Sequence, residues 1–300
     1  MSEEHQLTEI QEIACSCIDR WGEDINTQNF SGKLGRFVSQ LGDDKDLGRI
    51  FLELVKSYNY YSRESVDKLL KEFYNKIISE LKLKKQYTIY SRIEDDSKID
   101  SSNNFLSEFK IINDISNHFS HDIEKLSIND FDEIENIIFL DDIIGTGKTV
   151  KKFFEKNLEK VRQVKCYIFC IEILGEGKEF LEDYFEKNEI ECKIIYHNLH
   201  HKVFKKDHIF SDNHKKKEEL LRELEKEIWG KKSNFILGYN NSQAIVTFFR
   251  NTPNNTLSSF WYNRENWQGL FPRNDELPAF KKRKRNNVRY NIKKKGEFSK

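Results

Sequence analysis

Long apolar runs are missing from this chain of 300 residues. No uninterrupted apolar stretch approaches the ~20 residues that a membrane-spanning helix needs, so no membrane segment is predicted. The first residues, Met-Ser-Glu-Glu-His-Gln, are acidic and polar, so they are not expected to form a signal peptide. With a mean hydropathy of -0.74 and 33% charged residues, the chain is expected to be a cytoplasmic protein.

Paired cysteine motifs are also absent. The five cysteines form no Cys-x-x-Cys pair and are odd in number, which favours reduced thiols over a disulfide framework. Histidines do gather in one region, at His197, His200, His201, His208 and His214. No cysteine or carboxylate stands at a matching spacing, so a solvated loop explains these histidines better than a metal site.

An excess of charge of either sign is lacking too, because 50 basic residues balance 50 acidic ones. The distribution is uneven. Residues 281–300 hold ten Lys or Arg and one acid, which leaves a net charge of −9 on the other 280 residues. The basic run 281–295 could bind nucleic-acid phosphates with a steep salt dependence. A solubilising tail without fixed structure is the alternative, and the sequence leaves both open.

Segment 136–150 has the strongest chemical pattern of the chain. An apolar run ends in two adjacent acids, Asp141 and Asp142, and a turn follows two residues later, formed by Gly145, Thr146, Gly147, Lys148 and Thr149. This order predicts a buried strand, a carboxylate pair at its carboxyl end, and a loop of backbone amides that opens a helix. Such a loop binds phosphate, and the acids are suited to ribose hydroxyls or a hard cation. An Asp-rich turn with a glycine N-cap is the structural alternative.

The same segment is not a P-loop of nucleotide triphosphatases. That pattern requires a glycine, four residues, and then Gly-Lys-Ser/Thr. Counted back from Gly147, the first glycine should stand at the position of Asp142. A carboxylate there would repel a polyphosphate, so the P-loop pattern is broken at a position that would lie close to the phosphates.

The hydrophobic pattern divides the chain into four parts. Apolar residues at helical spacing in 6–21, 47–58 and 65–83 predict an N-terminal helical segment, residues 1–84. Strands alternate with helices in residues 85–232, which predicts an α/β core with a parallel sheet. The predicted strands are 86–91, 137–141, 164–174 and 190–197, and the helices are 101–116, 147–160, 177–187 and 214–229. An aromatic C-terminal extension (233–280) and the basic tail (281–300) follow.

Phe139 to Thr149 is similar to the signature of type I phosphoribosyltransferases. This resemblance implies that the catalytic acids Asp141 and Asp142 hold the 2′- and 3′-hydroxyls of phosphoribosyl pyrophosphate and face its Mg²⁺ through the ribose. It also implies that the following turn holds the 5′-phosphate. A second stretch, Pro253-Asn-Asn-Thr-Leu257 with Trp261 and Leu270-Phe-Pro-Arg273, resembles the C-terminal extension of the PRTase-CE family of bacterial conflict systems. Some members of that family are encoded beside reverse transcriptases.

The family resemblance also implies two further groups of contacts. Pyrophosphate would be held by a loop after the first core strand, with Ser91, Arg92, Lys98, Ser101 and Ser102 as candidates. Three acids in that loop, at positions 94–96, would repel pyrophosphate if they pointed inward. The acceptor would enter under a hood formed by Tyr239, Asn254, Asn255, Trp261 and Arg273. For Trp261, a small hydrophobic core under a long loop is the alternative.

Two functions are compatible with these patterns. The first is transfer of ribose 5-phosphate from phosphoribosyl pyrophosphate to a nucleobase, nucleotide or nucleic acid, within an antiviral defence or toxin system. The second is a non-catalytic protein that senses a phosphoribosyl or nucleotide ligand and binds nucleic acid or a partner protein through its basic tail.

Overall fold

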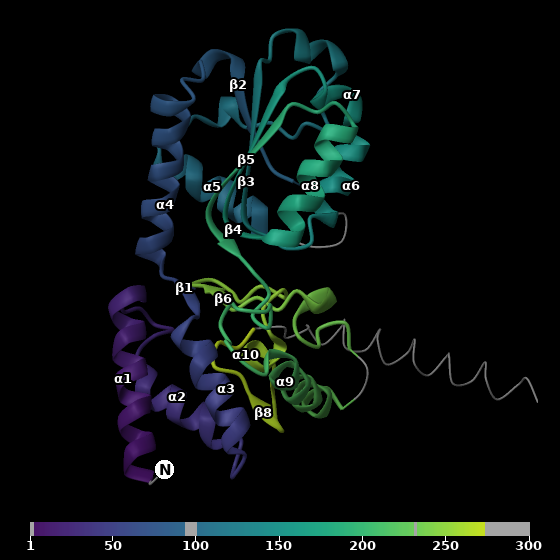
Figure 1. Cartoon of the computed structure of the whole chain (residues 1–300). Coiled ribbons are helices and arrows are strands. Elements are labelled where there is room, and N and C mark those ends of the chain that lie inside the picture. The colour runs from purple at the N-terminus through teal and green to yellow at the C-terminus, as the bar shows by residue number, and fades with distance from the viewer. Residues whose placement is uncertain (1–2, 94–100, 231–232, 274–300) are drawn as a thin grey trace, which may run out of the picture.

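The structure, a computed structural model, describes residues 3–93, 101–230 and 233–273 (Figure 1). The predictions for Lys98, for the acids 94–96 and for the basic tail lie outside the described residues, as do the side chains of Ser101 and Ser102. No helix in the described part of the chain is long and apolar enough to cross a membrane.

A parallel sheet of four strands forms the centre of the upper lobe in Figure 1. Its strands lie in the order β2 (Thr88–Ser91), β3 (Asn136–Ile144), β4 (Lys165–Leu174) and β5 (Cys192–His200). The apolar runs of β3 and β4 are buried along most of their length, as expected for strands covered on both faces. The predicted α/β fold with a parallel sheet is therefore confirmed.

Helices cover both faces of this sheet. On one face, α4 (Arg63–Asn75) and α5 (Ser101–Ile112) pack on Leu140 and Phe169. On the other, α6 (Lys148–Lys156), α7 (Leu158–Val161) and α8 (Gly175–Lys187) pack on Phe139 and Ile168. Successive residues of one strand thus enter two different cores. This arrangement follows from the period of two in a strand.

The N-terminal helices and the C-terminal extension share a third core in the lower lobe (Figure 1). It includes α1 (Glu3–Trp21), α2 (Phe30–Ser39), α3 (Lys45–Lys56), α9 (His214–Trp229) and α10 (Ser258–Trp261). Phe260 is fully buried there, with its ring centroid 5.6 Å from that of Phe51 and 4.9 Å from that of Tyr58. The sequence did not predict α2, because Gly32 and Gly35 interrupt its apolar stripe.

Two short strands join the N-terminal part to the extension. β1 (Asn59–Tyr61) pairs in parallel with β6 (Val246–Phe248), although most of the chain lies between them. A small hairpin of β7 (Asn263–Arg264) and β8 (Trp267–Gln268) follows. The remaining helical turns are one π-helix, Lys76–Glu80, and the 3-10 turns Lys85–Tyr87, Asn117–Phe119, Ile128–Asp132 and Tyr239–Asn241.

A buried carboxylate connects β1 to the core sheet. Glu172, on β4, has no exposed surface. Its Oε1 accepts hydrogen bonds from the Tyr61 hydroxyl (2.7 Å) and from Nδ2 of Asn59 (2.9 Å). Nδ2 of Asn198, on β5, lies 3.0 Å from Oε2, and Nδ1 of His200 lies 3.7 Å from the same oxygen. This polar cluster holds the two lobes together at one point.

Glu172 should make the stability of the protein depend on pH. Burial raises its pKa from 4.5 to about 7, against the lowering effect of its hydrogen bonds. The folded state then binds more protons than the unfolded state between these two values. The free energy of unfolding should therefore fall as pH rises through this window, by up to about 3 kcal/mol. Urea unfolding at several pH values measures this loss.

Glu172→Gln is the matched control for this pH dependence, because glutamine retains an oxygen for Tyr61 and Asn59. Burial lowers the pKa of His200 to about 4, and that histidine acts in the opposite direction in both proteins. The difference between wild type and variant therefore isolates the carboxylate. Parallel stability curves for the two proteins from pH 4.5 to 7 would contradict the prediction.

Candidate functional site

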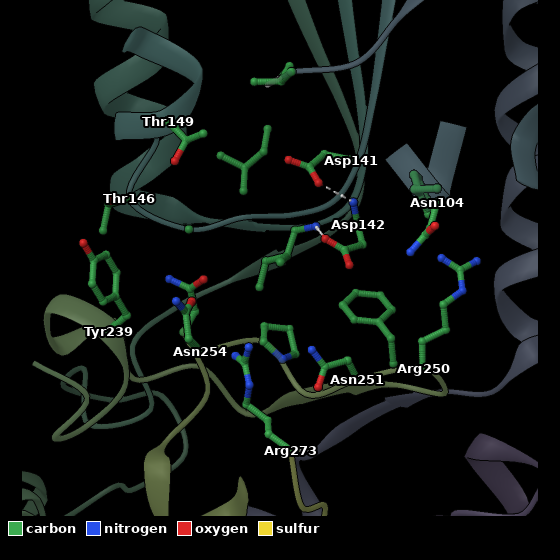
Figure 2. Close-up of a pocket in the computed structure, with 18 of the residues that line it drawn as sticks. Asn104, Asp141, Asp142, Thr146, Thr149, Tyr239, Arg250, Asn251, Asn254 and Arg273 are labelled. Carbon is green, nitrogen blue, oxygen red and sulfur yellow. Dashed lines mark hydrogen bonds between the residues drawn. The ribbon is translucent and has the colours of Figure 1, made fainter. Parts of the chain in front are cut away.

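A cavity of about 690 Å³ lies between the carboxyl ends of the core strands and the C-terminal extension (Figure 2). Ligands of parallel α/β sheets bind at this edge. Both predicted stretches border the cavity: the acid pair and glycine turn from above, and the Pro-Asn-Asn segment with Arg273 from below. Sequence similarity connected these two stretches only through the family that they resemble. In the structure, both stretches line the same cavity.

Asp141 and Asp142 lie near the end of β3 and are partly buried in the cavity wall. Oδ1 of Asp141 accepts a hydrogen bond from the backbone N–H of Asp142 (2.9 Å), and Oδ1 of Asp142 accepts one from the N–H of Ile143 (2.8 Å). Figure 2 draws both bonds. These contacts fix the two carboxylates beside each other, an arrangement that suits two neighbouring hydroxyls or a hard cation.

The turn 145–149 opens α6 at the same wall. Gly147 is the N-cap residue and has φ 73°. This left-handed conformation favours glycine, and a Cβ there would also lie 2.9 Å from Cγ of Leu181. The first N–H groups of a helix have no partner within the helix and attract anions. Lys148 and Thr149 are exposed at this helix start, and all five residues of the turn line the cavity.

The C-terminal extension packs directly on this turn. A Cβ at Gly145 would lie 2.3 Å from Nδ2 of Asn255. Gly177 of α8 closes on the turn from the other side, where an added Cβ would lie 2.0 Å from the Gly145 oxygen. Gly145 is thus required by the close approach of the Asn255 amide, and Gly177 is required by the close approach of the Gly145 carbonyl. Gly145 of the turn and Asn255 of the C-terminal extension therefore contact each other directly.

Gly145→Ala is expected to lower the free energy of unfolding by about 1–3 kcal/mol, because the new methyl group overlaps the Asn255 amide. Adding Asn255→Ala should recover at least about 1 kcal/mol of that loss, since it removes the atoms that clash. Urea unfolding of the wild type, both single variants and the double variant gives this coupling. Strictly additive effects would show that the contact does not restrict Gly145.

The two candidates for the pyrophosphate loop that the structure describes are placed differently. Ser91 is fully buried, and its hydroxyl lies 3.4 Å from the Arg92 carbonyl oxygen. Nη2 of Arg92 lies 3.5 Å from Oδ2 of Asp122. Neither residue lines the cavity, although Ile93 does.

The predicted hood residues separate into two sets. Tyr239, Asn254, Asn255 and Arg273 line the cavity. Trp261 does not: it is 4% exposed, and its indole N–H donates to the Thr256 carbonyl oxygen at 2.8 Å. Its ring lies 5.4 Å from the Arg273 guanidinium carbon. Trp261 therefore supports a cavity residue from behind, in the core.

Several polar residues of the cavity were not predicted from the sequence as site residues. Asn104 comes from α5, and Arg250 and Asn251 follow β6. No motif marks them. The available signal was the β-prone run before Arg250, because residues that follow a strand are the ones a parallel α/β architecture directs to its binding edge. β6 is only three residues long, which is too short for periodicity to reveal.

The sheet, the acid pair and the glycine turn define a protein with a phosphoribosyltransferase-type core. The chain belongs to the PRTase-CE family, whose model matches residues 34–273. The matched span extends from α2 to Arg273, so it includes most of the N-terminal helical part and the described extension.

Solved structures similar to the chain include two of low identity. One is the Helicobacter pylori xanthine-guanine-hypoxanthine phosphoribosyltransferase, with 11% identity and a TM-score of 0.32, covering 48% of this chain and 89% of that chain. The other is the AQ2163 protein from Aquifex aeolicus, with 12% identity and a TM-score of 0.29, covering 57% of this chain and 84% of that one. No curated protein matches the chain.

Proposed function

We propose that this protein binds phosphoribosyl pyrophosphate and transfers ribose 5-phosphate to an acceptor. The observation that carries this proposal is that the acid pair of β3 and the amide turn of α6 open into one cavity. The turn would bind the 5′-phosphate, and Asp141 and Asp142 would accept hydrogen bonds from the ribose hydroxyls. A ribose phosphate held at both ends has its anomeric carbon in a defined position, which lowers the entropic part of the barrier.

The residues of the cavity fit Mg²⁺ bound together with the substrate. Two adjacent carboxylates are hard oxygen donors, and Mg²⁺ is commonly held by one or two carboxylates together with substrate phosphates. Among the described residues, no group of three His, Cys, Asp or Glu side chains could hold a metal. The ion, when bound, would supply positive charge to the departing pyrophosphate. The side chains of Asp141 and Asp142 would hold the ribose beside it.

The acceptor would enter from the side of the extension. Tyr239 is 37% exposed and could stack on a base, and the amides of Asn254 and Asn255 offer donors and acceptors to a base edge. A nucleobase, a nucleotide or a nucleic acid fits this chemistry. The family resemblance supports a role in bacterial antiphage defence or as a toxin, and a cytoplasmic location remains a prediction.

Binding and turnover should be measured separately. Calorimetry with ribose 5-phosphate and with phosphoribosyl pyrophosphate, each with Mg²⁺, tests the site itself. Pyrophosphate release in the presence of nucleobases, nucleotides or nucleic acids tests transfer. We expect both ligands to bind and one class of acceptor to stimulate release. If neither ribose 5-phosphate nor phosphoribosyl pyrophosphate binds, the proposal is wrong.

A non-catalytic ligand sensor is the second candidate. It is favoured by the placement of Ser91 and Arg92 outside the cavity, because these were the predicted contacts to pyrophosphate. The expected signature is tight binding of phosphoribosyl pyrophosphate without release of pyrophosphate from any acceptor mixture. Salt-sensitive binding of nucleic acid or a partner protein, lost on truncation before residue 281, would support the sensing role further.

A further inference from the structure

The pyrophosphate end of the proposed substrate needs a cation, and the described cation of the predicted loop, Arg92, does not line the cavity. Phosphoribosyl pyrophosphate is highly anionic, and Asp141 and Asp142 add negative charge to the same cavity. Arg92 lies at Asp122, outside the cavity. Among the described residues that line the cavity, the cationic side chains are Lys148, Arg250 and Arg273. The position of each relative to the acid pair decides what each can contact.

The geometry of a ribose phosphate sets the direction of the substrate. C5 is attached to ring atom C4, C1 lies across the ring oxygen from C4, and the 2′- and 3′-hydroxyls lie between C1 and C4 along the other edge of the ring. With the 5′-phosphate at the turn and the hydroxyls at the acid pair, C1 must point away from the turn. Figure 2 shows Thr146, Thr149 and Tyr239 on one side of Asp142, and Arg250 with Asn104 on the other. The substituent of C1 therefore extends toward Arg250.

Two neighbours, Glu108 and Phe249, hold Arg250 in place. Its guanidinium forms an ion pair with Glu108 of α5, and its Cζ lies 4.9 Å from the ring centroid of Phe249. The Arg63 guanidinium packs on the same ring, at 5.5 Å. The side chain of Arg250 keeps 25% of its surface exposed. A guanidinium has five N–H donors and a carboxylate partner uses at most two of them in a fork, so donors remain for an anion.

Asn104 adds a neutral donor at the same end of the cavity. It precedes Glu108 by four residues on α5, so the two side chains lie on the same face of the helix. Asn104 is exposed and lines the cavity. The ion pair of Arg250 with Glu108 thus places the guanidinium beside the Asn104 amide. An anion bound here would meet a fixed positive charge with little loss of side-chain entropy.

We infer that Arg250, from the C-terminal extension, binds the pyrophosphate of the donor substrate in place of Arg92. This inference rests on the proposed function. Lys148 is exposed at the start of α6, on the phosphate side of the acids. Arg273 stands on the cavity floor below the acid pair, between Asn254 and Asn251 in Figure 2. Of the three cations, Arg250 lies farthest along the direction in which C1 points.

Calorimetry with three ligands tests the assignment. Phosphoribosyl pyrophosphate, ribose 5-phosphate and pyrophosphate are each titrated, with Mg²⁺, into wild type, Arg250→Gln and Arg250→Lys. Arg250→Gln should weaken the two pyrophosphate-containing ligands by about 10-fold to 100-fold, the range for a lost charged hydrogen bond. Ribose 5-phosphate should bind within about twofold of wild type, because it lacks the group that Arg250 contacts. Arg250→Lys should give an intermediate loss for the same two ligands, because lysine keeps the charge without the fork.

The control variant is Arg264→Gln, which removes an exposed arginine of the extension that does not line the cavity. It should leave all three affinities unchanged. Affinity for ribose 5-phosphate also reports folding of the site in each variant, so loss of the partly buried ion pair between Arg250 and Glu108 cannot imitate the expected pattern.

Three results would overturn the inference. Unchanged pyrophosphate affinity in Arg250→Gln would remove the proposed contact while leaving the proposed function intact. An equal loss for all three ligands would assign Arg250 a structural role. If pyrophosphate affinity is unchanged but the acceptor stimulates pyrophosphate release less than in wild type, Arg250 contacts the acceptor instead. Failure of wild type to bind any of the three ligands is a different outcome, since it removes the proposed function itself.

Discussion

Replacing Asp141 and Asp142 together by asparagine is expected to lower the rate of pyrophosphate release by about 100-fold or more. In the proposed function, asparagine removes both negative charges that would face the ribose and its metal, and a misplaced ribose alone can cost a factor of this size. The fold should survive, because an asparagine Oδ1 can still accept the backbone N–H bonds of residues 142 and 143. Initial rates of pyrophosphate release, with thermal unfolding of the same samples, measure both effects.

Asp207→Asn is the matched control for this pair, because the Asp207 side chain is 70% exposed and does not line the cavity. It should release pyrophosphate at the wild-type rate. If the double variant also keeps the wild-type rate, the two acids do not hold the reacting sugar, and the cavity serves some other chemistry. If the double variant binds ribose 5-phosphate with the wild-type affinity, the two acids likewise do not hold the sugar.

Phe260→Ala is expected to lower the free energy of unfolding by about 3–5 kcal/mol, the usual loss for a fully buried phenylalanine. Phe260 is 0% exposed, and its ring lies 5.6 Å from that of Phe37 and 4.9 Å from that of Tyr58. The substitution therefore opens a cavity between the extension and the N-terminal helices. Urea unfolding gives the size of the loss. Hydrogen exchange should report faster opening of α2 and α3 as well as of α10.

Phe180→Ala serves as the control for side-chain size, because Phe180 is 37% exposed. It should cost at most about 1 kcal/mol. If Phe260→Ala speeds hydrogen exchange in the extension and leaves the N-terminal helices unchanged, these two parts do not unfold together. The aromatic residues of the extension and those of the N-terminal helices would then stabilise two parts that open independently.

The strand, the acid pair and the glycine turn were readable from sequence because each has a local cause. The apolar run before Asp141 predicts a buried strand, the adjacent acids mark its end, and the glycines mark the turn into α6. In the structure β3 continues to Ile144, beyond the predicted end at 141, because the acids and the two apolar residues after them keep extended backbone. Fold class and family membership followed from these local patterns together with the C-terminal motif.

The far end of the cavity was not readable in the same way. Arg250 gains its position from the pairing of β6 with β1 and from an ion pair with Glu108 on α5. Both contacts join segments that are distant in the sequence, so no local pattern specifies them. Trp261 illustrates the opposite case. The sequence allowed either a ligand contact or a place in a small hydrophobic core, and the structure shows the core: the indole N–H is bonded there, where a buried tryptophan needs such a partner.

The core that the N-terminal helices share with the C-terminal extension has a consequence for how the protein is made. A ribosome releases α1, α2 and α3 long before the segment that ends at Phe271, which completes their shared core. Until then, the apolar faces of these helices have no permanent cover in the nascent chain, a condition that promotes aggregation and recruits chaperones. The lower lobe therefore cannot complete its core until translation has passed Phe271, whereas the strands and helices of the upper sheet can assemble earlier.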